Sequence, residues 1–228
     1  MKKIIFAIFA HPDDESFGPS GTLLLESHAG AEVHLITLTC GDSGMNPDNC
    51  EDLGKVRLAE WRAAGKLIGV HAMHYLGYSD GQLCNRTMIE VSQRITDLIS
   101  DIIVDQPDDI EIEFMSNDLN GITGHIDHIV AARAACFVFY TLKERDTRVN
   151  RLRLACITRG ELPDVNLDWL YMEPGRTNEE VDETIDASHV REELKAIIRA
   201  HHTQRSDGEA HIKKRADRLG VDSFIVKR

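Results

Sequence analysis

One polar stretch near the start of the chain constrains both its fold and its chemistry. Residues 4–10 form an uninterrupted apolar run of β-branched, aromatic and alanine residues, which predicts a buried β-strand. Residues 11–15, His-Pro-Asp-Asp-Glu, follow directly. Because proline has no N–H to donate, the strand should end at Pro12 and the polar side chains should project from its carboxyl end. In open α/β sheets, ligands bind at that end of the strands.

Strand and helix patterns alternate along the first two thirds of the chain. Strands are expected at residues 32–39, 73–76, 110–115 and 153–158, helices at residues 22–29, 53–68, 87–104 and 129–142, and loops at residues 45–52 and 116–124. This alternation predicts right-handed βαβ units. We therefore expect an α/β fold, a Rossmann-like three-layer sandwich with a mostly parallel sheet, in which residues 1–228 form a single domain.

The C-terminal part is less regular. Its expected elements are weak strands at residues 167–172 and 181–185, helices at residues 190–202 and 212–219, and an edge strand at residues 223–226.

Charge, hydropathy and cysteine usage narrow the class of protein. The net charge of −12 argues against nucleic acid as a partner, because phosphate backbones are bound through excess Lys and Arg. No apolar run approaches the roughly 18 residues of a membrane span, and we expect no signal peptide. The five cysteines are odd in number and never spaced C-x-x-C, which favours reduced thiols in the cytoplasm. A homo-oligomer is compatible with the sequence.

Two histidine motifs indicate a metal site. His11 and Asp14 are three residues apart, as are His125 and His128, and each pair falls where a predicted strand gives way to a helix. Both motifs should therefore open onto the same edge of the sheet. Catalytic zinc usually keeps three protein ligands, drawn from histidines and carboxylates, and one position for water. The pattern predicts such a site.

The two adjacent carboxylates should have different roles. Asp13 and Asp14 are neighbours in a turn and cannot easily point the same way, so one can bind metal while the other faces the water as a general base. A helix-capping turn is the simpler alternative for this stretch. The helix start disfavours protonated rings at His125 and His128, which suits metal ligation, and Asp127 could hold a ring N–H.

A second histidine pair, His71 and His74, has the same spacing as His125 and His128. It lies in a loop that enters a strand, and we interpret it as incidental.

Residues 11–15 and the segment Gly124-His125-Ile126-Asp127-His128 together resemble the PIG-L/LmbE-like family of zinc-dependent N-acetylglucosaminyl deacetylases. The likeness extends along nearly the whole chain, through Gly41, Arg57-x-x-Glu60, residues 78–81 and residues 202–204. The resemblance implies that His11, Asp14 and His128 hold zinc, that Asp13 is the general base and that His125 steadies the oxyanion. It further implies that Arg57 and Asp80 grip sugar hydroxyls and that His202 and Gln204 border the site.

The activity implied by the resemblance is hydrolysis of a linear amide C–N bond. A metal-activated water would remove an acetyl or other acyl group from an N-acetylglucosamine-containing small molecule or glycoconjugate. One Zn²⁺ per chain is expected, and another divalent metal such as Fe²⁺ is compatible. The alternative is a zinc-dependent amidase that acts on a thiol conjugate or another non-sugar amide.

Two readings from other classes receive less support. Cys40 follows a predicted strand and could be a nucleophile, but no base lies beside it in the sequence. A nucleotide-binding Rossmann domain would need a glycine-rich first turn, and residues 1–17 contain no glycine.

The chain departs from the family pattern at three places. Ile126 replaces a usual proline, Cys40 stands where an arginine is common, and Thr123 lies where an aromatic residue is frequent. These changes leave the expected chemistry intact and bear on the choice of substrate.

Overall fold

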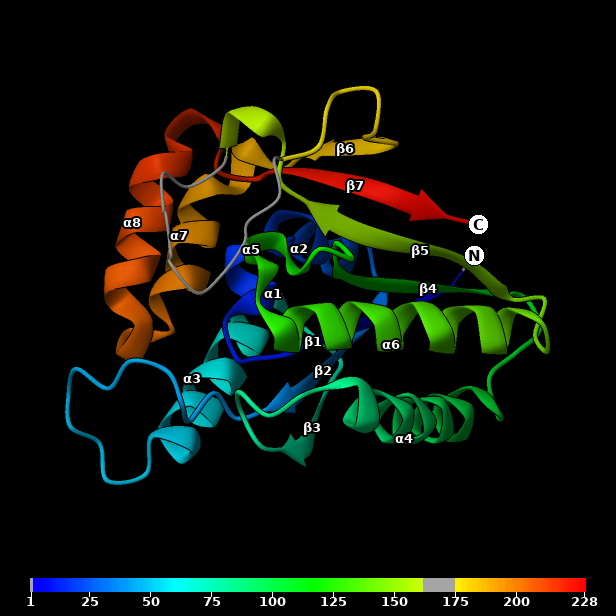
Figure 1. Ribbon diagram of the computed structural model, residues 1–228. Helices are drawn as coiled ribbons and strands as arrows, with labels where there is room; N and C mark the ends of the chain where they lie inside the picture. Colours follow the sequence, from blue (N-terminus) through cyan, green and yellow to red (C-terminus); the bar gives the residue numbers. More distant parts are fainter. Residues whose placement is uncertain (1, 162–174) are drawn as a thin grey trace.

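The computed structural model describes residues 2–161 and 175–228 (Figure 1). Its described strands form one seven-stranded sheet in the order β3-β2-β1-β4-β5-β7-β6. The strands are β1 (Lys2–Phe9), β2 (Glu32–Thr39), β3 (Ala72–Tyr78), β4 (Ile110–Asn117), β5 (Val149–Cys156), β6 (Glu183–Asp186) and β7 (Val221–Lys227). The pairs from β3 through β5 are parallel, whereas β7 is antiparallel to both β5 and β6. The predicted α/β class with a mostly parallel sheet is confirmed.

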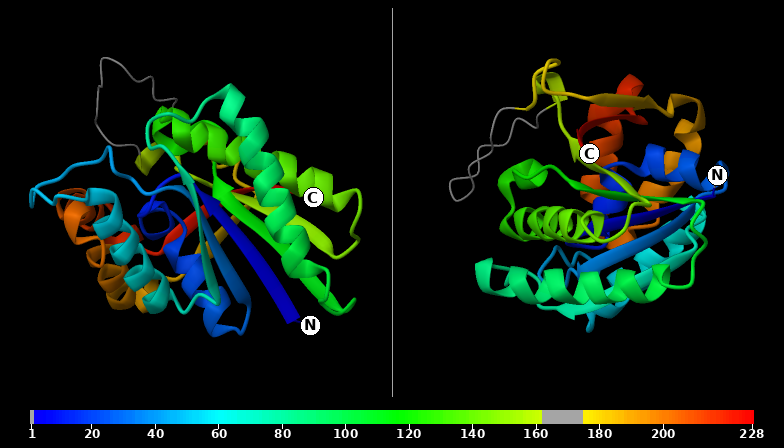
Figure 2. Two further views of the ribbon diagram at one scale, coloured as in Figure 1. Left: turned by 90° about the horizontal axis from the view of Figure 1, so that it is seen from below. Right: turned by 90° about the vertical axis from the view of Figure 1, so that its right-hand side faces the viewer.

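Helices cover both faces of this sheet. They are α1 (Asp14–Phe17), α2 (Ser20–His28), α3 (Leu53–Ile68), α4 (Asn85–Ile103), α5 (Gly121–Gly124), α6 (Ile126–Lys143), α7 (Arg191–Arg199) and α8 (Arg205–Arg215). Figures 1 and 2 show α4 and α6 side by side on one face, with α2, α3 and α7 on the other. No helix in the described ranges is long and apolar enough to cross a membrane.

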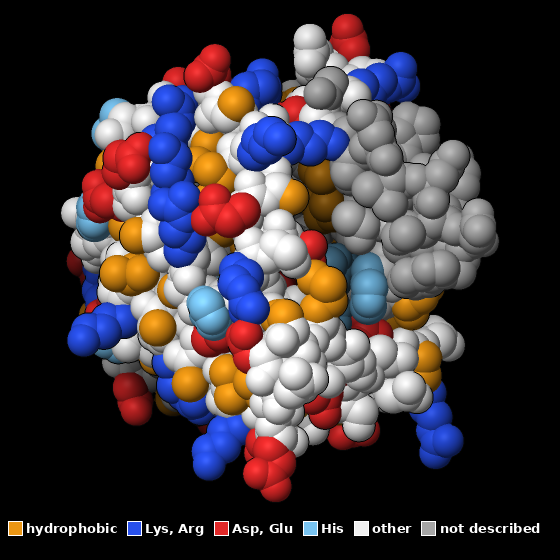
Figure 3. Space-filling model, turned by 90° about the vertical axis from the view of Figure 1, so that its left-hand side faces the viewer, with side chains coloured by type: hydrophobic (Ala, Val, Ile, Leu, Met, Phe, Trp, Pro, Cys, Tyr) orange, Lys and Arg blue, Asp and Glu red, His pale blue; other side chains and the backbone are white. Residues whose placement is uncertain are grey.

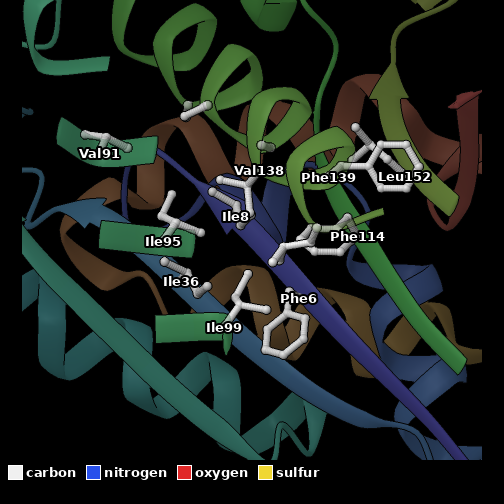
Figure 4. Close-up of a cluster of buried hydrophobic side chains, with 14 of the residues drawn as sticks. Phe6, Ile8, Ile36, Val91, Ile95, Ile99, Phe114, Val138, Phe139 and Leu152 are labelled. Carbon is white, nitrogen blue, oxygen red and sulfur yellow. The ribbon is translucent and has the colours of Figure 1, made fainter. Parts of the chain in front are cut away.

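Residues 4–9 of strand β1 are all apolar because both faces of the strand are covered. Phe6 and Ile8 point into a cluster beneath α4 and α6 (Figure 4), whereas Ala7 and Phe9 point into a second cluster beneath α2, α3 and α7. Fully burying a side chain of the size of Phe or Ile contributes roughly 1.5–3 kcal/mol. The central position of β1 is therefore set by its own composition.

This position also places the functional edge of the sheet. Because β1 pairs in parallel with both β2 and β4, the strand order reverses there. The carboxyl ends of β1 and β4 form the kind of crevice in which α/β proteins bind ligands. Residues 11–15 leave β1 at this edge, and α5 and α6 follow β4 there (Figure 1).

The structure corrects several details of the sequence-based expectations. Residues 116–124 are not one loop, because β4 continues to Asn117 and α5 follows. Strand β7 is not an edge strand, because β6 pairs with it on its outer side. The expected strand at residues 167–172 lies outside the described residues.

Helix α8 begins at Arg205 rather than at residue 212. Its first turns carry no apolar stripe because they pack through Gly208, where an added Cβ would lie 3.0 Å from Cγ2 of Ile198.

Strand β4 carries a charged side chain that is buried. Glu113 is 1% exposed. Its carboxylate lies 3.3 Å from Nζ of Lys3, 3.0 Å from Nε of Arg151 and 3.5 Å from Nη1 of Arg153. The charge is buried because cations from the two neighbouring strands, β1 and β5, surround it.

Glu113→Ala should lower the free energy of unfolding by about 3–5 kcal/mol, because it leaves buried cations without their shared carboxylate. Glu111→Ala, on the same face of the strand but at a less buried position, should change it by no more than about 0.5 kcal/mol. Urea unfolding followed by circular dichroism measures both. Equal effects would show that the buried network contributes nothing specific.

Candidate metal centre and active site

The turn after β1 separates its two adjacent carboxylates. Oδ2 of Asp14 accepts the backbone N–H groups of Ala10 and His11, each at 3.0 Å, which folds the turn back onto the strand. Asp13 has φ 110°, a conformation that costs a non-glycine residue roughly 1–3 kcal/mol, and its N–H donates to Oε2 of Glu15. As a result Asp14 faces the histidines, whereas Asp13 faces Arg57.

The three predicted metal ligands converge from the turn after β1, from α1 and from α6. Nδ1 of His11 lies 3.0 Å from Nε2 of His128, and that Nε2 lies 3.1 Å from Oδ1 of Asp14. The distance between Nδ1 of His11 and Oδ2 of Asp14 is 3.8 Å. Ligand atoms around a tetrahedral zinc lie roughly 3.3 Å apart, given bonds of about 2.0–2.1 Å. One nitrogen of His125 also lies within 4.8 Å of the other two histidines.

Neighbouring groups orient both ligand histidines. Nε2 of His11 lies 2.9 Å from Oδ1 of Asp80 and 3.3 Å from Oδ2 of Asp127. Nδ1 of His128 lies 3.1 Å from the carbonyl oxygen of Gly121 and donates to it. These acceptors place the ring protons on the outer nitrogens, so the inner nitrogens are left for a metal.

The charge around His11 fits a cation. Burial alone would lower the pKa of His11, but hydrogen bonds to Asp127 and Asp80 and the charge of Asp14 outweigh it and raise the pKa to about 10. Burial would raise the pKa of Asp14, yet His128 and His11 hold it well below its usual range. Three carboxylates surrounding one imidazole need positive charge, which a dication supplies. The donor set and its charge thus suit a divalent metal.

Arg57 is bound to protein groups on several sides. Its Nη2 lies 2.7 Å from Oδ2 of Asp13 and donates to the carbonyl of Pro12 at 2.6 Å, and Nη1 donates to the carbonyl of Gly41 at 2.6 Å. Gly41 has φ 71°, and a Cβ there would lie 2.2 Å from Nη1 of Arg57. Glycine is therefore required at position 41.

The environment of Asp13 brings the pKa of its carboxyl group close to neutral pH. Burial raises the pKa of Asp13, the Arg57 charge lowers it and the Asp14 charge raises it, with a result of about 6. This value is well suited to a general base at neutral pH.

His125 is the N-cap residue of α6. Its Nδ1 accepts the N–H of Asp127 at 3.2 Å, so the ring proton is on Nε2. Burial, followed by the charges of His128 and His11, lowers the pKa of His125 and keeps the ring neutral. The sequence argument predicted the direction of this shift from the helix dipole, whereas burial is the largest cause. Ile126, the departure from proline, is 56% exposed.

The loop at residues 79–83 is held against α6. Oδ2 of Asp80 accepts the N–H of Ser43 at 2.8 Å, and Asp127 accepts the N–H groups of Gly81 and Leu83. Asp80 and Arg57 thus make most of their polar contacts within the protein. Their contact with sugar hydroxyls stays a prediction.

The late histidine at the site was missed by the sequence argument. The side chain of His202 is 68% exposed and lies 3.6 Å from Asp48, whereas His201 is fully buried, with Nε2 2.9 Å from Oε1 of Glu15. Gln204 is buried and donates to the carbonyl of Met45 at 3.0 Å. Helical spacing from the buried residues of α7, at positions 194, 197 and 198, points to position 201 and could have identified it.

Figure 3 shows histidine side chains gathered at one place on the surface, with acidic side chains beside them. His11, Asp14 and His128 could together hold a metal ion, and the carboxylate of Asp13 lies next to them in the turn. Residues 6–139 match the family model of PIG-L, GlcNAc-PI de-N-acetylase, and the chain belongs to this family. It is accordingly a hydrolase acting on an amide bond.

Similar proteins are found among curated sequences and solved structures. The chain is 27% identical over 239 residues to the 1D-myo-inositol 2-acetamido-2-deoxy-alpha-D-glucopyranoside deacetylase of Mycobacterium sp. (strain KMS), which covers 90% of this chain and 74% of that protein. The N,N'-diacetylchitobiose deacetylase of Pyrococcus horikoshii has a TM-score of 0.71 at 20% identity, over 99% of this chain and 83% of that one.

The 4-carboxy-2-hydroxymuconate hydratase of Pseudomonas putida KT2440 has a TM-score of 0.67 at 14% identity, over 100% of this chain and 97% of that one. At such identities the two structures show the fold alone. The same fold therefore carries proteins named for different reactions.

Asp127→Asn should weaken divalent-metal affinity roughly 10–100-fold, because an amide holds the His11 ring less well than a carboxylate. His202→Ala should leave that affinity unchanged, since His202 contacts no ligand. Competition for Zn²⁺ against a chromophoric chelator measures both constants. An unchanged constant in Asp127→Asn would show that this carboxylate does not support the metal ligand.

Proposed function

We propose that the chain is a zinc-dependent N-deacetylase that acts on an N-acetylglucosamine-containing small molecule or glycoconjugate. The observation that carries the proposal is the convergence of His11, Asp14 and His128 with Asp13 beside them. The names of the curated relative and of the Pyrococcus horikoshii deacetylase support a substrate of this class. We further propose that residues 1–228 form one deacetylase domain.

In this proposal His11 Nδ1, His128 Nε2 and the Asp14 carboxylate hold one Zn²⁺. Two imidazoles and one carboxylate are typical of catalytic zinc. When bound, the metal acts as a Lewis acid toward the acyl oxygen and makes water more acidic. Asp80, Asp127 and the Gly121 carbonyl keep the two rings in place.

Asp13 accepts the proton of the attacking water. The water oxygen bonds to the acyl carbon, the C–N bond breaks, and the nitrogen leaves as an amine once it is protonated, so acetate and a free amine result. Arg57 holds the carboxylate of Asp13 at 2.7 Å and keeps it ionised at neutral pH. Arg57 is in this view a positioning residue as well as a candidate sugar contact.

His125 stabilises the oxyanion. Its Nδ1 is occupied by the N–H of Asp127, which leaves Nε2–H as the donor. Removing one such donor commonly costs about 3–4 kcal/mol in the barrier. Asp80, His202 and Gln204 are proposed to border the substrate, the last two through the loop at residues 45–52 that they contact. The five free cysteines support a reducing, cytoplasmic location.

Asp13→Asn should retain zinc and lose activity by about 10²–10⁴-fold, because the base is gone while the ligands remain. His128→Ala should lose zinc as well as activity. Metal analysis beside an amine-release assay on N-acetylglucosamine derivatives measures both, with Asp207→Asn on the surface of α8 as a control. Near-normal turnover of Asp13→Asn with saturating metal would remove Asp13 from the mechanism. Release of amine only from non-sugar amides would favour the amidase alternative.

The activity should fall as the pH drops through about 6 or below, because protonated Asp13 cannot accept a proton and a bound cation lowers its pKa further. Arg57→Gln removes a charge that lowers this pKa, so the acid limb of kcat/KM should move upward by about one pH unit or more. Arg57→Lys keeps the charge and should move it less. An acid limb unchanged in Arg57→Gln would mean that another group controls it.

A further inference from the structure

A second group of metal-ligating side chains lies on the β2–β3 edge, away from the active site. Glu32 and His34 are in the first half of β2, whereas His71 precedes β3 and His74 is within it. One ligand atom each of Glu32, His34 and His71 lies within 4.8 Å of the other two. The parallel register, with His34 opposite Ala72, brings together residues that are far apart in the sequence.

His34 is held in place by its neighbours. It is 5% exposed, and its ring lies 5.1 Å from that of Phe6 and 5.3 Å from that of His71. Its Nδ1 lies 3.1 Å from Nε2 of His74, and the two rings are stacked. With Nδ1 engaged by His74, Nε2 is the nitrogen that His34 can offer to a metal. His74 thus resembles the outer partners that orient ligand histidines in metal sites.

The donor atoms at this cluster suit a metal ion. Glu32 supplies a carboxylate oxygen, and His34 and His71 supply imidazole nitrogens, which are ligands that Zn²⁺ binds. Lys2 pairs with Oε1 of Glu32 at 2.9 Å, which leaves Oε2 as a ligand oxygen. His71 is exposed, so an ion can reach the cluster from solvent.

We propose that Glu32, His34 and His71 bind a divalent transition metal of the Zn²⁺ or Ni²⁺ kind, with His74 fixing the tautomer of His34. Imidazole suits these metals, whereas Mg²⁺ and Ca²⁺ prefer oxygen ligands alone. His34 lies five residues before Thr39 at the end of β2, about 17 Å at roughly 3.3 Å per residue. The ion is therefore separate from the one proposed at His11.

The experiment measures Zn²⁺ bound per full-length chain by equilibrium dialysis and metal analysis. His71→Gln should bind one ion fewer than the wild type, or bind it at least about 100-fold more weakly, since a lost ligand costs more than a lost outer partner. His74→Phe should weaken the same ion roughly 10–100-fold. His189→Gln, at an exposed histidine in the turn before α7, is the matched control and should bind as the wild type does.

His71 is exposed, so its replacement should leave the fold and kcat/KM unchanged. The proposal is overturned if His71→Gln binds as many ions as the wild type with equal affinity, or if His189→Gln loses the same ion. His128→Ala separates the two sites, because it should lose the active-site ion and keep this one. The failure of either proposal is thus distinguishable from that of the other.

Discussion

The site depends on the hydrogen bonds that the Asp14 carboxylate accepts from the backbone at the end of β1. One oxygen accepts the N–H groups of Ala10 and His11, while the other faces His128 on α6. The same carboxylate therefore ends the strand and joins β1 to the first turn of α6, while Asp13 takes a left-handed conformation and faces Arg57. Because both of its oxygens are used, this one side chain fixes the end of the strand relative to His128.

Several carboxylates gather around Asp14, and backbone N–H groups and histidine side chains bind them. Asp127 accepts two backbone N–H groups from the loop at residues 79–83, and Asp80 accepts one from Ser43, while both reach Nε2 of His11. Carboxylates that are bound in this way cannot turn away from the cluster. These bonds hold the cluster in one arrangement, which would lower the cost of binding a cation there.

Sequence reasoning identified the central strand, the alternation of elements and the residues that converge at its end, because each rests on local pattern. Helix α3 and strand β2 were predicted with the observed bounds, since their periodicity and flanking glycines are local. It failed where contacts are distant in sequence. The burial of His201 and of Glu113 was not foreseen, because only packing shows which side chains are buried. The cluster at His34 was missed because strand register joins its members.

The sequence by itself determined the fold class, the alternation of strands and helices along the first two thirds of the chain, and the histidines and carboxylates at the sheet edge. These features depend on hydrophobic periodicity and turn residues, which act over a few positions. Tertiary structure decided which nitrogen of each histidine faces inward, which aspartate meets Arg57 and which charges are buried. Those outcomes depend on acceptors such as the Gly121 carbonyl and on cations from other strands. Folding brings these groups within hydrogen-bonding distance, and their spacing along the sequence does not indicate that they will meet.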